Sequence, residues 1–369
     1  MGNVYVLTPD LQLPVGGVRQ HYRLVDTLNR AGISAAIVHG DKGFRCRWFE
    51  NSTPLVYASE TIAKPEDLIV IPEELIGLVP TLAPGVPKIV FNQNAYTTFV
   101  WDTAPAGIKA AYSHPDIFSV LVVSDDNVEY MRNVFPELRI DRARYEIDPT
   151  LYFLPKTKRR ALSYMPRKRS AECKEVISIL EVSELLDGWE IWSIDGISEE
   201  KAAEMIRESS IFLSFSYREG FGLPPAEAMA SGCIVIGFDG FGGREFFGSH
   251  SLLIPDGDTK AFSSAVLDVL RKWETDQERF SEMGKAGAAF IANNYSRTAH
   301  EDSVISVFAE AMAAPRAASG GGILHVPRYG HPRWRAAGSH VKRALQQTSI
   351  GASVKHFNSA ASILWRGYD

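Results

Sequence analysis

The sequence predicts an α/β protein built from two domains, each organised around a parallel sheet. The chain has 369 residues, which is enough for two domains of ordinary size. Its beginning shows the order strand, glycine-containing loop, helix and strand of a βαβ unit. A similar alternation restarts at residue 160, after a proline-bounded segment at 148–155 that resembles a hinge. We therefore expect domains at 1–150 and 151–313, followed by a tail at 314–369.

The composition is that of a globular protein and excludes several classes. Apolar residues make up 45% of the chain, and the net charge of −5 is too mild to indicate nucleic-acid binding. Three widely spaced cysteines, Cys46, Cys173 and Cys233, favour a reducing compartment over a disulfide framework. No stretch approaches the roughly 18 apolar residues of a membrane span. Because no signal peptide is evident either, we expect a cytoplasmic protein.

The predicted strands of the first half are short apolar runs that suit burial in a parallel sheet. They are 4–7, 34–38, 68–71, 88–91 and 119–123, with helices at 18–30 and 127–134. Gly16 and Gly17 precede the first helix without forming a G-x-G-x-x-G dinucleotide fingerprint. Taken alone, the pair fits a ligand-facing loop and a tight turn equally well.

Polar side chains follow two of these strands. Asn92, Gln93 and Asn94 come directly after the strand 88–91, and ligands bind at such strand ends in open α/β sheets. Ser124 follows another strand and heads a helix, so a helix cap and a ligand contact are both open for it. The histidines form no spaced pair with cysteine or aspartate, and we interpret them as structural.

The second half repeats the alternation. Its predicted strands are 160–165, 189–194, 211–215 and 233–237, and its helices are 171–184, 199–208, 260–273, 277–293 and 298–313. The run Arg167-Lys168-Arg169 follows the first of these strands, where cations can hold a diphosphate. A solvated basic turn is the alternative. Asp256-Gly257-Asp258 predicts a turn and a helix cap, and we expect no metal site.

The most informative stretch is Ser216 to Gly232. A buried strand at 211–215 leads into Gly220-Phe221-Gly222, and Pro224 and Pro225 fit the first turn of a helix. Free N–H groups at such a helix start, with the helix dipole behind them, hold an anion such as phosphate. The segment therefore predicts a phosphate-binding loop.

Two carboxylates frame this helix start. Glu219 is expected in the loop and Glu227 about one turn into the helix. A carboxylate repels a phosphate, so a carboxylate beside a phosphate site must bind a different group. Accepting hydrogen bonds from neutral hydroxyls is such a use, and a sugar and a ribose both offer them.

This stretch resembles the E-x7-E motif of retaining GT-B glycosyltransferases, especially glycosyltransferase family 4. The matching positions are Ser216, Glu219 to Leu223, Glu227 to Ala230 and Gly232. The resemblance covers about residues 1–310. It implies two Rossmann-like domains facing across a cleft, the GT-B fold. It also implies transfer of a sugar from a nucleotide-diphosphate sugar to a glycan or lipid-linked acceptor, with retention at the anomeric carbon and without metal or cofactor. Polysaccharide or lipopolysaccharide synthesis is a frequent setting for this family.

The resemblance assigns a role to each matching residue. Glu219 is the catalytic residue and contacts hydroxyls of the donor sugar, while Glu227 contacts the ribose. Lys174 is an alternative to Lys168 as a cation at the diphosphate. The donor-binding residues are expected to be Gly16, Gly17, Arg167, Lys168, Phe221, Gly222, Leu223 and Glu227.

Two departures from the family affect other parts of the expected site. Relatives carry a functional histidine in the first domain, and here the amides Asn92, Gln93 and Asn94 are the acceptor-side candidates. Relatives also have Gly-Gly-x-Pro-Glu after a later strand. The corresponding loop here, Gly242 to Glu245, is one residue shorter.

The tail is basic, with Asp369 as its one acid. Gly320 to Gly322 suggests a flexible break, and residues 354–365 have the spacing of an amphipathic helix. Such a helix can lie on the anionic inner face of a membrane or pack on the core. Two other functions stay open for the whole chain: a nucleotide-sugar epimerase, and a non-catalytic or partner-dependent sugar-binding protein on the same fold.

Overall fold

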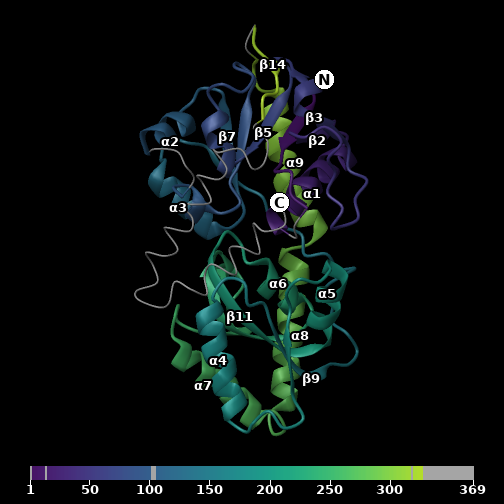
Figure 1. The fold of residues 1–369 in the computed structure, drawn as a ribbon, viewed down its shortest axis with the longest axis vertical. Coiled ribbons are helices and arrows are strands. Elements are labelled where there is room, and N and C mark those ends of the chain that lie inside the picture. The colour runs from purple at the N-terminus through teal and green to yellow at the C-terminus, as the bar shows by residue number, and fades with distance from the viewer. Residues whose placement is uncertain (1, 13–14, 101–104, 317–318, 327–369) are drawn as a thin grey trace, which may run out of the picture.

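A computed structural model describes residues 2–12, 15–100, 105–316 and 319–326. It contains two separate parallel sheets, one above the other in Figure 1, with helices packed around both. The first sheet has the strand order β3-β2-β1-β5-β6-β7-β8 and the second β10-β9-β11-β12-β13. The predicted α/β fold with two Rossmann-like sheets is confirmed. The amphipathic helix expected at 354–365 lies outside the described residues.

The first sheet places its strand-order reversal between β1 and β5, which both pair with neighbours in parallel. Its strands are β1 (Val4–Leu7), β2 (Ala35–His39), β3 (Leu55–Tyr57), β5 (Leu68–Pro72), β6 (Lys88–Phe91), β7 (Ile117–Val122) and β8 (Ile140–Arg142). Its helices are α1 (Gly16–Arg30), α2 (Pro105–Tyr112) and α3 (Asp125–Val134). Ligands bind beyond the carboxyl ends of strands at such a reversal.

The second sheet is smaller. Its strands are β9 (Arg159–Tyr164), β10 (Glu190–Ser193), β11 (Ser209–Glu219), β12 (Ile234–Phe241) and β13 (Ser251–Leu253). Its part of the chain contains α4 (Ser170–Val182), α5 (Glu199–Glu208), α6 (Leu223–Ala230), α7 (Thr259–Lys272) and α8 (Gln277–Asn294). Among the described residues, no helix is both long and apolar enough to cross a bilayer.

The chain crosses between the sheets twice. After α8 it returns to the first sheet as α9 (Arg297–Ala313), which lies beside α1 in the upper half of Figure 1. The N–H of Ile147, on the first crossing, donates to the carbonyl of Tyr295, on the second, at 3.0 Å. Arg139, directly before β8, pairs with Glu310 of α9. The last helix thus ties the two halves together.

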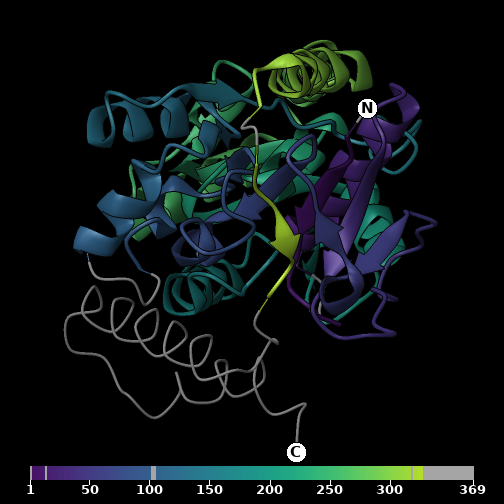
Figure 2. The same ribbon diagram turned by 90° about the horizontal axis from the view of Figure 1, so that it is seen from above.

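The glycines at 320–322 form an ordered attachment, so the predicted flexible break is wrong. Gly322 and Ile323 form β14 (Gly322–Ile323), which pairs antiparallel with β4 (Ile62–Ala63) near the top of Figure 1. Figure 2 shows this yellow-green strand from above, extending across the first domain. A Cβ on Gly321 would lie 2.2 Å from the Ala63 carbonyl oxygen, so glycine is needed there for close approach. Buried Leu324 anchors the segment.

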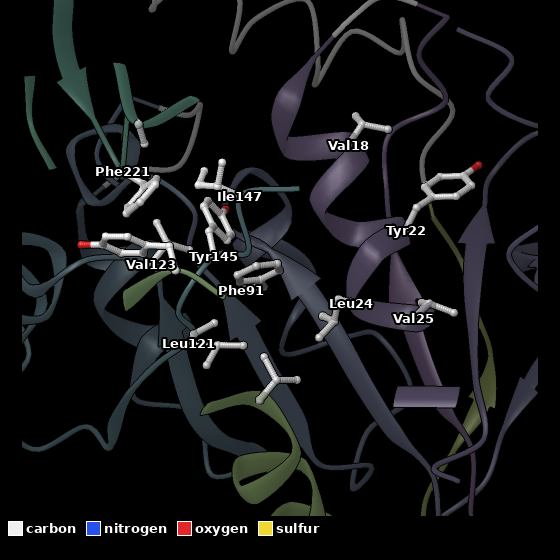
Figure 3. Packing of buried hydrophobic residues seen from close by; sticks show 14 of the residues in the cluster. Val18, Tyr22, Leu24, Val25, Phe91, Leu121, Val123, Tyr145, Ile147 and Phe221 are labelled. Atoms are coloured by element: carbon white, nitrogen blue, oxygen red, sulfur yellow. The ribbon is translucent and has the colours of Figure 1, made fainter. Parts of the chain in front are cut away.

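One apolar cluster continues from the first sheet into the second. It includes β-sheet and α1 residues of the first half together with Phe221 and Phe246 of the second. Figure 3 shows Phe221 beside Tyr145 and Ile147. The Phe221 ring centroid lies 5.5 Å from that of Tyr145 and 5.0 Å from that of Tyr295. Burying this aromatic group holds the two halves against each other.

The backbones of the two halves meet at Gly220. A Cβ added there would lie 1.7 Å from the carbonyl oxygen of Gln93, at the end of β6. Gly242 is equally confined, because its Cβ would lie 2.4 Å from the Gly220 carbonyl oxygen. The contact between the halves therefore depends on the absence of side chains at these positions.

We predict that Gly220→Ala lowers the free energy of unfolding by about 3 kcal/mol, because the methyl group must push two backbones apart. Urea denaturation of the full chain measures this. Gly248→Ala is the control, since a Cβ at Gly248 meets nothing within 4 Å. Equal stability of the two variants would show that the backbone contact is not as described.

Candidate active site at the interface of the two sheets

The segment 216–232 adopts the predicted order of strand, loop and helix. β11 ends at Glu219, so this glutamate is the last strand residue and not a loop residue as predicted. Gly222 caps α6 with φ +92°, a conformation that favours glycine. α6 has prolines in its first turn and no side-chain cap. Because proline lacks an N–H, the N–H groups of Gly222 and Leu223 are the donors at this helix start.

The start of α1 lies against the start of α6. Gly16 is the first residue of α1, and a Cβ on it would lie 3.4 Å from Cδ1 of Leu223. Val15, at the N-cap position, gives no side-chain hydrogen bond to the helix. The N-termini of α1 and α6, one from each half of the chain, therefore meet, and neither has a side-chain cap. Their partial positive charges add at this point and favour an anion.

Glu219 lies beside this point at the carboxyl end of β11. Its Oε1 is 2.6 Å from Nζ of Lys168, and their side chains are 19% and 47% exposed. The missing side chain of Gly240 makes room for it, since a Cβ there would lie 3.0 Å from Cγ of Glu219. The structure thus brings Glu219 and Lys168 together as a solvent-accessible ion pair.

Glu227 is buried in α6 and contacts the first half of the chain. Nη2 of Arg19, on α1, lies 3.4 Å from its Oε1. Burial raises the pKa of Tyr152, and the charge of Glu227 adds to this effect. Arg19 also pairs with Glu199 at the start of α5. Sequence analysis missed Arg19. An arginine on the buried face of α1, two residues after the glycine pair, is the signal that could have identified it.

The basic run 167–169 divides into three different environments. Lys168 reaches Glu219, whereas Nε of exposed Arg167 lies 3.8 Å from Asp195. Arg169 is buried, donates to the Ser216 carbonyl and stacks on Tyr217 and Phe238. Only Lys168 of this run is placed next to Glu219. The alternative cation, Lys174, is exposed on α4.

The three acceptor-side amides are not equivalent. Asn92 is fully buried and donates to Thr98 and Tyr112, so it does not face the interface. Gln93 is at the interface, but its amide is engaged on all sides: Nε2 contacts the Gly17 carbonyl and His21, and Oε1 accepts from the Tyr145 hydroxyl at 2.7 Å. Their placement suits support of the loop better than contact with an acceptor.

Asn94 links the halves. Its Nδ2 donates to the Arg218 carbonyl at 2.8 Å, and its Oδ1 accepts from the Tyr96 N–H. It therefore fixes the position of the β11 loop relative to the end of β6.

The loop after β12 also bridges the halves. Glu245 accepts from the Asp125 N–H at 2.8 Å and from the Tyr295 hydroxyl at 2.7 Å, and it pairs with Arg142 of β8. Burial raises the pKa of Glu245. In this chain the glutamate of the shortened loop joins the two sheets.

Two buried titratable side chains, Glu73 and His21, form hydrogen bonds with Gln93. Oε2 of Glu73 accepts the Gln93 N–H at 3.1 Å, and His21 lies between Gln93 and Thr8. Burial raises the pKa of Glu73 to about 8, with the charge of Glu74 adding to the effect. Burial lowers the pKa of His21 to about 3. Both groups are therefore neutral at pH 7, so these two side chains place no charge next to Gln93.

The helix-cap predictions are confirmed. The Asp258 side chain accepts from the Ala261 N–H at 2.8 Å at the start of α7. The Ser124 side chain accepts from the Asn127 N–H at the start of α3. Within the described parts of the chain, no three His, Cys, Asp or Glu side chains gather as a metal site would require.

Comparison with known proteins shows which family the second half of the chain resembles. Residues 191–287, which run from β10 into α8 and include the loop at 216–232, match the family model for glycosyl transferases group 1. This segment is thus similar to group 1 glycosyltransferases, and the match supports glycosyltransferase function. An alpha-1,6-glucosyltransferase of Actinobacillus pleuropneumoniae serotype 7 (strain AP76) is 29% identical over 228 residues, covering 59% of this chain and 67% of that protein.

Solved structures show that this glycosyltransferase has the GT-B fold. A variant of S. aureus TarM, in complex with fondaparinux, alpha-GlcNAc-glycerol and UDP, matches with TM-score 0.66 at 11% identity, covering 85% of this chain and 100% of that one. A sucrose-phosphate synthase from Thermosynechococcus elongatus matches with TM-score 0.61 at 16% identity over the same shares. WaaG, a glycosyltransferase involved in lipopolysaccharide biosynthesis, gives 0.54 at 9% identity, covering 84% and 100%.

We predict that Arg19→Met destabilises the glycosyltransferase by about 3 kcal/mol, because it leaves the buried Glu227 without its cation. A double-mutant cycle with Glu227→Gln, measured by urea denaturation, isolates the pair. The double variant should be more stable than the sum of the two single losses predicts. Strictly additive losses would contradict a direct interaction between Arg19 and Glu227.

A second prediction concerns pH. In the folded chain Glu73 keeps its proton up to about pH 8, whereas an unfolded glutamate releases it near 4.5. The folded state then binds more protons than the unfolded state between these values, so Glu73 makes stability fall as pH rises. Glu73→Gln removes this dependence. The free energy of unfolding of the variant, relative to that of the wild type, should therefore rise from about pH 5 to about pH 8. A stability difference that is constant with pH, as expected for the exposed control Glu181→Gln, would contradict the buried, protonated carboxyl.

Proposed function

We propose that this glycosyltransferase is a retaining enzyme that takes its sugar from a nucleotide-diphosphate sugar bound where α1 and α6 meet. The observation that carries the proposal is the meeting of two uncapped helix N-termini beside Glu219 and Lys168. Positive helix ends stabilise the charge that grows on a departing diphosphate, and a site that is already organised does so without rearrangement.

Glu219 and Lys168 separate when the donor binds, in this proposal. An ion pair this exposed contributes about 1 kcal/mol at most, so a diphosphate can take over Lys168 at little cost. Glu219 is then free to accept hydrogen bonds from donor-sugar hydroxyls. The bond between the anomeric carbon and the diphosphate oxygen breaks, and a bond to the acceptor hydroxyl oxygen forms on the same face of the sugar. The hydroxyl proton passes to the departing diphosphate.

In this proposal Glu227 binds the ribose of the donor. Arg19 contacts its Oε1, and a buried pair of this kind is costly to break, so we expect it to persist. The other carboxylate oxygen then accepts from the ribose. The backbone of Phe221, Gly222 and Leu223 and the opposing Gly16 and Gly17 enclose the diphosphate, while the exposed Arg167 contributes charge at the rim.

UDP-glucose is the first donor to test. The relative named an alpha-1,6-glucosyltransferase supports glucose, and the UDP in the TarM complex supports the base. The acceptor is a glycan or lipid-linked sugar of polysaccharide or lipopolysaccharide synthesis, a setting that the fold match to WaaG favours. A thermal-shift panel of UDP-, GDP-, ADP-, CMP- and TDP-sugars with their free nucleotides identifies the base, because a ligand of the folded state raises the melting temperature.

We predict that Glu219→Gln reduces turnover of the selected donor by at least about 100-fold while the melting temperature changes little, because the lost charge acts on the reacting sugar. Nucleotide release from the donor, with and without candidate acceptors, gives the rate. Glu278→Gln, on the exposed face of α8, is the control. Unchanged turnover in Glu219→Gln would overturn the catalytic role. An isomerised nucleotide sugar appearing without acceptor would indicate an epimerase.

A further inference from the structure

Two strand ends of the second sheet lie beside each other at Glu219. One is the end of β11, where Arg218 precedes Glu219. The other is the end of β12, and Phe241 is the register partner of Glu219 across the two strands. The backbones of these two loops are therefore immediate neighbours of the proposed catalytic residue.

Aromatic rings from both halves gather over these loops. The ring of Tyr96, after β6, lies 5.5 Å from the ring of Phe241, and the two planes are inclined by 36°. The ring of Tyr130, on α3, lies 5.1 Å from Tyr96. All three side chains are half-buried, so part of their surface is accessible. Partly exposed aromatic faces with a few polar groups are typical of small-molecule sites.

Two exposed arginines stand at the edge of this aromatic group. The guanidinium of Arg244 lies 5.4 Å from the Phe241 ring centroid and pairs with Asp239 at 3.3 Å through Nε. The guanidinium of Arg218 lies 5.4 Å from the ring of Tyr217. Within the described part of the chain, no carboxylate lies in ion-pair distance of Arg218. One guanidinium and part of another are thus available to an anion.

Two carboxylates near this aromatic group accept hydrogen bonds from it. Asp126 accepts from the Tyr96 hydroxyl at 2.7 Å, and Asp239 accepts from the Phe241 N–H at 2.9 Å. Burial raises the pKa values of both Tyr96 and Tyr130, while Arg244 and Arg218 respectively act to lower them. The tyrosines therefore stay neutral, and both arginines are exposed.

The backbone holds these side chains in place at an energetic cost. Arg218 has φ +44° and Phe241 has φ +68°, the left-handed region that glycine would occupy more easily. Such conformations cost about 1–3 kcal/mol each for other residues. Asn94 secures the first of them through its bond to the Arg218 carbonyl. Arg218 and Phe241 thus occupy positions whose positive φ angles favour glycine.

We propose that Arg218, Arg244, Tyr96, Tyr130 and Phe241 form an acceptor subsite for a sugar that carries an anionic group, either a phosphate or a carboxylate. The aromatic faces cover the sugar ring and the guanidinium groups pair with the anion, next to Glu219. This inference rests on the proposed function, because it assigns the acceptor of the same reaction.

Binding measured with UDP present at saturation tests the subsite, since UDP keeps small anions away from the diphosphate position. The probes are glucose 6-phosphate, glucuronate and neutral methyl α-glucoside, titrated into the full chain by calorimetry. We expect at least one anionic probe to bind about 10-fold more tightly than the neutral one. Which of the two does so distinguishes a phosphate from a carboxylate. Inorganic phosphate alone should bind more weakly than the preferred sugar.

The variants are Arg218→Asn, which suits a positive φ, and Arg244→Gln, with the exposed Arg271→Gln on α7 as the control. Each test variant should lose about 10-fold in affinity for the anionic probe and leave methyl α-glucoside and UDP unchanged. Anionic probes that bind no better than the neutral one, or that bind both variants as well as the control, would overturn the subsite. Failure of the wild type to bind UDP, with arginine-dependent binding of the anionic probe, would overturn the proposed donor and leave the subsite standing.

Discussion

The close approach of two backbones, at Gly220 and at the carbonyl of Gln93, determines the rest of this structure. It exists because Gly220 and Gly242 have no side chains to separate the loops. Phe221 then inserts between Tyr145 and Tyr295 and joins the apolar cores of the two sheets. The same contact brings the start of α1 to the start of α6, so the fold and the proposed donor site depend on one constraint.

Two ion pairs near this interface differ in their exposure. The pair Glu219–Lys168 is exposed and contributes about 1 kcal/mol at most, so a ligand can replace it. The pair Glu227–Arg19 is buried, and removing either partner costs about 3 kcal/mol or more. The first pair suits a residue that must change partners during a reaction. The second suits a residue that holds a fixed position between the two halves.

The sequence predicted what local patterns control. Apolar runs located the central strands, and the glycines and prolines of 216–232 located α6 within one or two residues. Short edge strands such as β3, β8 and β13 were not predicted, because three residues are too few to show a hydrophobic period. The environments of Arg169 and Asn92 could not be predicted, since both depend on partners that the fold brings from other elements. Arg19 was missed for the same reason: Glu227 lies far along the chain, and only the packing of α1 against α6 joins them.

Hydrogen–deuterium exchange of the full chain, with and without the nucleotide that gives the largest thermal shift, tests the central claim most directly. The claim is that the donor binds where the two helix starts meet. It predicts that residues 15–19 and 216–232 become protected together, although they belong to different sheets. Protection confined to one of these segments, or found only elsewhere in the chain, would contradict it.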